Sequence, residues 1–190
     1  MCGRFTLKES TKVKEKFGIN ISPSYNISPG TKLLTLNNNS IDFLNWGYSP
    51  TWAKKPFDLI NARIETIDEK PSFKNAERCL IIADGYFEWK KSVRKIPYYF
   101  HMNNELFFFA GIFNNTSGCC IVTHNADQPL STIHERQPLI IQGNDSKKWL
   151  DKTFNFNYRK KIEMDYYEVS TKVNSPKNNT KENINSLEIA

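Results

Sequence analysis

The feature that most limits the folds open to this chain is a succession of apolar runs rich in β-branched and aromatic residues. Such runs, separated by turn residues, favour β-strands, and they lie at 31–36, 41–48, 78–91, 96–102, 106–113 and 119–123. Helical patterns are confined to 6–17 and 144–154, and the serines, prolines and glycine of 22–30 predict a loop. Because the strands follow one another without alternating helices, we predict an α+β fold with a largely antiparallel, curved or barrel-like β-sheet and a few flanking helices.

The length and composition indicate a single domain. A chain of 190 residues, 39% of them hydrophobic, is long enough to bury one core. We expect the core to span about residues 1–173 and the polar residues 174–190 to form a C-terminal loop or tail. The 26 Lys and Arg against 20 Asp and Glu give a net charge of +6. This charge favours a polyanionic partner without identifying one.

The cysteines and histidines do not form a metal-binding pattern. Cys2, Cys79, Cys119 and Cys120 include no C-x-x-C pair, and the three histidines lack zinc-ligand spacing. No apolar run approaches the ~18–20 residues of a membrane span, and the charged N-terminal region lacks the apolar segment of a signal peptide. We expect a reduced cytoplasmic protein, a monomer, without metal, cofactor or membrane partner.

The chain begins with the residues MCGRF, which place a cysteine at position 2. If Met1 is removed, Cys2 carries a free amine and a thiol on adjacent carbons. The amine, with an ordinary pKa of about 7.7–8.0, can attack an aldehyde to form a Schiff base. The thiol, with an ordinary pKa of about 8.5, can then close onto the imine carbon and form a thiazolidine ring. The five residues alone leave open the alternative that Met1 is retained and Cys2 is an ordinary residue.

Several polar residues interrupt apolar or turn-rich segments. Asn61 and Arg63 lie in LINARIET, which otherwise suits a packed strand, and Glu88 lies between two aromatic residues in GYFEWK. A carboxylate among aromatic residues is a candidate for a raised pKa and for acid–base chemistry. Simple alternation along a strand would instead place Glu88 in solvent. His134 lies in a polar loop, where a lone histidine is usually a surface residue.

These features occur together in one order along the chain. MCGRF, SYNISPG, NARIET, RCLIIADGYFEWKK and STIHERQPLII resemble motifs of the SOS-response-associated peptidase family, whose members process abasic sites in DNA. The resemblance runs from residue 1 to about residue 151, and YYEVSTKVNSPKNN resembles the C-terminal strand and loop of the family.

The resemblance implies a specific chemistry for four residues. Cys2 is the nucleophile that traps the C1′ aldehyde of an abasic site in single-stranded DNA as a thiazolidine crosslink, which can be reversed. Glu88 matches the catalytic glutamate that transfers protons during Schiff-base formation and reversal. His134 matches the histidine that protonates the sugar oxygen, and Asn61 matches the asparagine that positions the linkage. The resemblance also implies lyase-type chemistry and self-processing at the Met1–Cys2 bond, either autocatalytic or by an aminopeptidase.

The resemblance also predicts the residues that contact DNA. Arg4, Arg63 and Arg136 neighbour the matched site residues in sequence, and the planar guanidinium group suits phosphate. Pro29 and Trp52 lie in loops that line the strand in the family. Some relatives carry a second aromatic residue after the tryptophan, whereas this chain continues with Ala and Lys, so the strength of base stacking at Trp52 is left open. When bound to DNA, the protein is expected to associate with the nucleoid.

Three alternatives remain at this stage. An N-terminal-nucleophile cysteine hydrolase of the glutamine amidotransferase type also begins Met-Cys-Gly and uses the cysteine thiol on an amide. A peptidase acting on other proteins and a non-catalytic DNA-binding module are the other two. An adduct with abasic DNA that survives denaturation distinguishes the crosslinking protein from all three.

Overall fold

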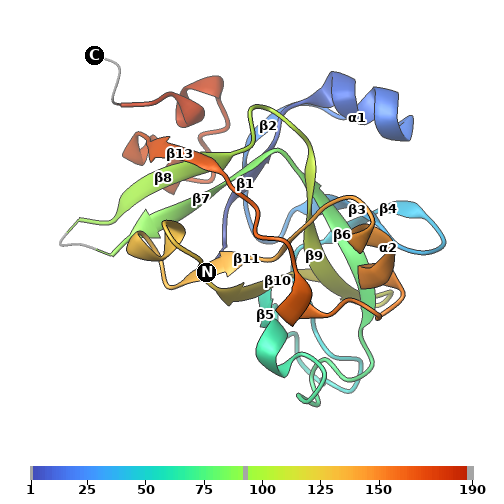
Figure 1. Cartoon of the computed structure of the whole chain (residues 1–190). Coiled ribbons are helices and arrows are strands. Elements are labelled where there is room, and N and C mark those ends of the chain that lie inside the picture. The colour runs from blue at the N-terminus through green and yellow to red at the C-terminus, as the bar shows by residue number, and fades with distance from the viewer. Residues whose placement is uncertain (1, 92–93, 188–190) are drawn as a thin grey trace.

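A computed structural model describes residues 2–91 and 94–187, which form two β-sheets around a shared core (Figure 1). In the five-stranded sheet the order is β13–β8–β7–β1–β2, and each neighbouring pair is antiparallel. Its strands are β1 (Phe5–Leu7), β2 (Ser24–Ile27), β7 (Gly85–Lys90), β8 (Ile96–His101) and β13 (Asp165–Glu168).

The second sheet contains eight strands. Its main path is β11–β10–β9–β6–β3–β4, with β12 beside β9 and β5 parallel to β10. Its strands are β3 (Lys32–Leu36), β4 (Ile41–Asn45), β5 (Asn61–Arg63), β6 (Glu77–Ala83), β9 (Phe107–Asn114), β10 (Gly118–Asn125), β11 (Arg136–Pro138) and β12 (Ile140–Ile141). The α+β, mostly antiparallel prediction is confirmed. The barrel-like form is not confirmed, because the sheets are not closed into a barrel.

The apolar run predicted at 78–91 forms two strands that belong to different sheets. The chain leaves the larger sheet at the end of β6 and enters the smaller sheet as β7, with Asp84 between them. A Cβ atom at Gly85 would lie 2.1 Å from Tyr99 Oη, so glycine at this position leaves the space that the Tyr99 side chain of β8 occupies. The crossing places β7 beside β1, with Tyr86 opposite Phe5.

Two α-helices, α1 (Ser10–Phe17) and α2 (Asp145–Leu150), occur in the described part of the chain. The helix predicted at 6–17 begins later than expected, because residues 5–7 pair with β2 and β7 as strand β1. Asp84 stabilises the turn between β1 and α1, because its carboxylate accepts hydrogen bonds from the backbone N–H groups of Lys8 and Glu9 just before α1. The helix predicted at 144–154 is confirmed over the shorter range of α2.

The loop predicted at 22–30 is wrong for its central residues. Ser24–Ile27 form the edge strand β2, which pairs with β1, and the turn is confined to the residues around Gly30, where φ is +86°. Turn-forming serine and proline residues flank this short strand on both sides. Local composition therefore favours a loop, whereas pairing with β1 decides the structure.

The C-terminal segment packs against the smaller sheet and contains 3-10 turns at Thr171–Asn174 and Lys181–Ile184. Asn26 of β2 holds it, since its amide nitrogen donates to the carbonyl oxygens of Val173, Ser175 and Asn178 at 3.3, 3.0 and 2.6 Å. Asn183 is buried in the same segment. Residues 174–187 are thus an ordered part of the fold that begins beside β2 and ends beside β13, where Ser186 pairs with Val169. The last three residues of the predicted tail lie outside the described residues.

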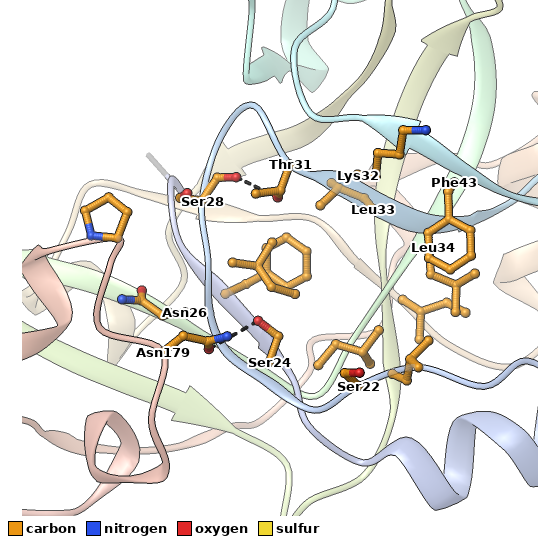
Figure 2. Close-up of a pocket in the computed structure, with 16 residues that line it drawn as sticks. Ser22, Ser24, Asn26, Ser28, Thr31, Lys32, Leu33, Leu34, Phe43 and Asn179 are labelled. Atoms are coloured by element: carbon orange, nitrogen blue, oxygen red, sulfur yellow. Dashed lines mark hydrogen bonds between the residues drawn. The ribbon is translucent and has the colours of Figure 1, made fainter.

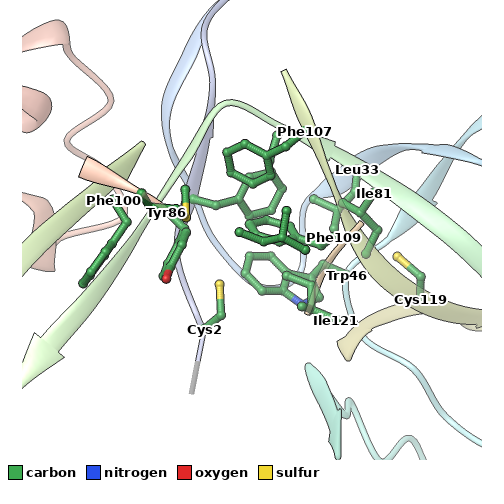
Figure 3. Close-up of a cluster of buried hydrophobic side chains, with 14 of the residues drawn as sticks. Cys2, Leu33, Trp46, Ile81, Tyr86, Phe100, Phe107, Phe109, Cys119 and Ile121 are labelled. Carbon is green, nitrogen blue, oxygen red and sulfur yellow. The ribbon is translucent and has the colours of Figure 1, made fainter. Parts of the chain in front are cut away.

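Aromatic side chains fill the space between the sheets (Figure 3). The Phe5 ring lies 5.3 Å from the Trp46 ring and 5.5 Å from the Phe109 ring, and Tyr86 stacks on Phe100 at 4.8 Å. Such pairs are worth about 0.5–1.5 kcal/mol beyond the burial of their surface. Phe5, close to the start of the chain, is thereby fixed in the core.

Candidate catalytic pocket

Cys2 lies just before β1 at the margin of the aromatic core (Figure 3). Its side chain is fully buried, and its backbone carbonyl accepts a hydrogen bond from Asn61 Nδ2 at 3.0 Å. Two residues later the backbone joins β7, because the Phe87 N–H donates to the carbonyl of Arg4 at 2.9 Å. Asn61 of the larger sheet and β7 of the smaller sheet therefore hold Cys2 between them.

The surroundings of Cys2 also determine the protonation state of its thiol. Burial raises the pKa of Cys2 well above its usual range, and the nearby negative charge of Glu88 raises this pKa further. A thiol in this environment is protonated at neutral pH. It is therefore not a preformed thiolate nucleophile.

Glu88 lies in the middle of β7 and is only 4% exposed. The alternation that would place it in solvent does not hold, because the four consecutive residues from Gly85 to Glu88 are all buried. Burial raises the pKa of Glu88 from 4.5 to about 7. A carboxyl group with this pKa is present in both protonation states near neutral pH, so it can accept or donate a proton.

A pocket of about 370 Å³ opens beside Glu88. Its walls come from β7 and the segment that follows, from the loop before β11, and from the C-terminal segment. The lining residues are Glu88, Trp89, Lys91, Lys95, His134 and Asn174. Acid–base groups, lysine ammonium groups and an amide therefore meet in one space.

His134 lies between the 3-10 turn at Leu130–Thr132 and β11. Its Nδ1 lies 3.0 Å from the backbone nitrogen of Arg136 and 3.1 Å from the carbonyl oxygen of the same residue, so Nδ1 bonds to this backbone in either neutral tautomer. Burial lowers the pKa of His134 below 6.5. The neutral imidazole is thus the main form at neutral pH.

The structure brings together the four residues predicted to be catalytic. Asn61 binds the backbone of Cys2, Glu88 acts electrostatically on the Cys2 thiol, and His134 shares the pocket with Glu88. The Oδ1 atom of Asn61 is buried and has no hydrogen-bond partner among the described residues. This atom is therefore available to accept a hydrogen bond from a group that enters the site.

Four pocket residues were not predicted as site residues: Trp89, Lys91, Lys95 and Asn174. Trp89 Nε1 donates to Asn174 Oδ1 at 2.7 Å, which joins the end of β7 to the C-terminal segment. Asn174 lies in a stretch of Asn, Ser, Pro and Lys residues that reads as a loop. No local pattern distinguishes it from its neighbours, so only the tertiary structure reveals it.

The three predicted DNA-binding arginines have different environments. Arg63 is exposed on β5, whereas Arg136 is 6% exposed and forms a bidentate ion pair with Glu65 at 2.6 and 2.9 Å. Arg4 Nη1 donates to Asn26 Oδ1 at 2.8 Å and to the carbonyl of Val173 at 2.7 Å. Arg63 is therefore the most accessible to a phosphate group, and contact with DNA stays a prediction for all three.

Pro29 and Trp52 lie in exposed loops, as a DNA-lining role requires. Trp52 is 56% exposed and meets Phe57 edge to face at 5.4 Å. Phe57 is itself 45% exposed and was not predicted. It supplies a second aromatic ring in the loop where Ala53 and Lys54 follow Trp52.

A second cavity, of about 280 Å³, lies between β2, β3 and the C-terminal segment (Figure 2). Its lining is mainly aliphatic and aromatic, with hydroxyl and amide groups and with Lys32 as its ionisable side chain. It therefore lacks the acid–base pair of the Glu88 pocket.

Among residues 2–91 and 94–187, no three His, Cys, Asp or Glu side chains gather where they could hold a metal ion. No helix in these ranges is long and apolar enough to span a membrane.

Comparison with known proteins identifies the family. The model of the SOS response associated peptidase (SRAP) family matches residues 1–176. The chain belongs to this family. The abasic site processing protein YoqW of Bacillus subtilis is 37% identical, over 98% of this chain and all of YoqW. The abasic site processing protein YedK of Escherichia coli is 33% identical over 79% of both chains.

A solved structure has the same fold as this chain. The crystal structure of a protein from Bacteroides thetaiotaomicron superposes with a TM-score of 0.80 at 23% identity, covering 97% of this chain and 99% of that protein. At this identity the likeness establishes the shared fold. The SRAP match includes every residue that lines the Glu88 pocket, Asn174 among them.

Proposed function

We propose that this SRAP protein captures abasic sites in single-stranded DNA through Cys2 after removal of Met1. The observation that carries the proposal is the burial of Cys2 beside Glu88, with Asn61 bound to its backbone. The names of YoqW and YedK, both abasic site processing proteins, agree with this substrate. Met1 lies outside the described residues, so its removal is part of the proposal.

The first step joins the Cys2 amine to the C1′ aldehyde of the ring-opened abasic sugar. The nitrogen attacks the carbonyl carbon, and loss of water leaves an imine. The ionised form of Glu88 accepts the proton that the attacking amine loses, and the protonated form donates to the departing hydroxyl group. A pKa of about 7 keeps both forms of Glu88 populated for these two transfers.

The second step closes the ring. The Cys2 sulfur bonds to the imine carbon, the C=N double bond becomes a single bond, and the thiol proton passes to nitrogen. Glu88 is ionised again once it has donated to the departing hydroxyl group, so it can accept the thiol proton and pass it to the nitrogen. The product is a thiazolidine. In the reverse direction Glu88 again acts as acid and base, and His134 exchanges a proton with the sugar oxygen.

The environment of the thiol also bears on the alternative of a cysteine hydrolase. Thiol hydrolases depend on a thiolate or on a thiol that is readily deprotonated, whereas burial and the charge of Glu88 both oppose ionisation of Cys2. The aldehyde reaction begins at the amine and tolerates a protonated thiol. We therefore favour aldehyde capture, with peptide-bond cleavage limited to maturation at Met1–Cys2.

A denaturing gel with an abasic single-stranded oligonucleotide tests the proposal. The native protein should give a shifted band without added reductant, whereas Cys2→Ala should give one only after borohydride reduction, because its α-amine still forms a Schiff base. Protein that retains Met1 should give no thiazolidine band. An equal, reductant-independent shift by Cys2→Ala would overturn the proposal.

A further inference from the structure

Asn174 has a defined orientation at the wall of the Glu88 pocket. Its Oδ1 accepts the hydrogen bond from Trp89 Nε1 at 2.7 Å. An indole N–H can only donate, so the amide oxygen must face Trp89 and the amide nitrogen must point away from it. This nitrogen has no hydrogen-bond partner among the described residues. Its two N–H groups are therefore available to a bound molecule.

The backbone around Asn174 is fixed as well. The preceding residue, Val173, is buried, and its carbonyl oxygen accepts hydrogen bonds from Arg4 at 2.7 Å and from Asn26 at 3.3 Å. Arg4 lies two residues from Cys2, so the same contacts connect the C-terminal segment to the start of the chain. The side chain of Asn174 is thus held by Trp89, and the peptide group that precedes it is held by Arg4 and Asn26, which is the arrangement expected of a group that orients a ligand.

On the basis of the proposed function, we infer that Asn174 donates a hydrogen bond to a hydroxyl oxygen of the ring-opened abasic deoxyribose. This contact holds the sugar in the pocket beside Glu88 and His134. Lys91 and Lys95 line the same pocket and carry the charges that suit phosphate. The neutral amide of Asn174 suits the neutral hydroxyl group that forms when the sugar ring opens. An undamaged nucleotide has a closed sugar ring and does not present this hydroxyl group.

Single-turnover capture measured with four variants tests this inference. Asn174→Ala removes the donor, and Asn174→Asp also removes it but keeps an oxygen for Trp89. Trp89→Phe releases the amide from its fixed orientation. Asn179→Ala is the matched control, because Asn179 lies in the same segment but binds Ser24 and the backbone of Tyr25.

We expect both Asn174 variants to slow adduct formation at saturating abasic DNA by about tenfold, the usual effect of one lost hydrogen bond. Trp89→Phe should slow it less, and Asn179→Ala should leave it unchanged. The affinity of Asn174→Ala for the undamaged strand should change by less than about twofold, because its phosphates are the same. The melting temperature of each variant separates these effects from loss of folding.

Three results would overturn the inference. The first is a native capture rate for Asn174→Ala. The second is a native rate for Asn174→Asp while Asn174→Ala is slow, which would limit Asn174 to supporting Trp89. The third is an equal loss of affinity for damaged and undamaged strands, which would indicate a phosphate contact. Each leaves the Cys2-dependent adduct intact. Failure of the native protein to form that adduct would instead overturn the proposed function.

Discussion

Asp84 and Glu88 are two buried carboxylates, one directly before β7 and the other in the middle of it, and their surroundings differ completely. Asp84 is fully buried and accepts hydrogen bonds from Thr6 Oγ1 at 2.6 Å and from two consecutive backbone N–H groups before α1. Glu88 is almost as buried but lines a pocket of about 370 Å³. Burial raises the pKa of both groups.

The contrast shows that burial and a raised pKa do not by themselves identify a catalytic group. The carboxylate of Asp84 is surrounded by donors from the protein, which leaves no place for a substrate. Glu88 faces a space that a substrate can enter, and His134 lines the same pocket. We therefore assign Asp84 to the connection between the two sheets and Glu88 to proton transfer.

The largest expected effect follows from Glu88→Gln. Glutamine keeps the shape of the side chain but cannot exchange a proton, and general acid–base catalysis typically contributes ~10²–10⁴-fold. We expect adduct formation and release to slow by about 10²-fold or more, with release affected more strongly. Native protein should show a pH–rate profile with a step near pH 7 that the variant lacks. Native-like rates in the variant would place Glu88 outside the reaction.

Asp84→Ala should have the opposite pattern. It leaves the Thr6 hydroxyl and two backbone N–H groups without their acceptor, and each buried unsatisfied group costs about 1–3 kcal/mol. We expect the free energy of unfolding to fall by about 3 kcal/mol, measured by urea denaturation, while the capture rate per folded molecule stays native. If Asp84→Ala also slowed capture in fully folded protein, the assignment of Asp84 to structure alone would be wrong.

The same two residues show how far the sequence could predict the fold. The apolar run containing both was correctly predicted as strand, but a run of residues cannot reveal that its halves join different sheets. That division depends on the close approach of Gly85 to Tyr99 and on the turn that Asp84 stabilises before α1. Both are tertiary contacts between segments far apart in sequence.

The candidate site was predictable where residues match a motif and unpredictable where they do not. Cys2 and Glu88 lie in segments whose residue order is distinctive. Asn174 lies in a polar stretch without periodicity, and its role depends on Trp89, which is 85 residues away along the chain. The exposure of an arginine is equally a tertiary property, since Arg136 is paired with Glu65 whereas Arg63 is exposed.

The smallest expected effect is on the pH dependence of the free energy of unfolding, and it separates the contribution of Glu88 from that of Asp84. Because the folded pKa of Glu88, about 7, lies above its value of 4.5 in the unfolded chain, the folded state binds more protons between these pH values. The contribution of Glu88 to the free energy of unfolding is therefore fully present below about pH 4.5 and is lost as the pH rises to 7. Between pH 5 and pH 7 this contribution falls by about 2 kcal/mol. Glu88→Gln, measured by urea denaturation at both pH values, should lack this part of the decline, whereas the part due to Asp84 should remain. An identical pH dependence in the native protein and the variant would show that Glu88 titrates normally and would remove the physical basis for its role in proton transfer.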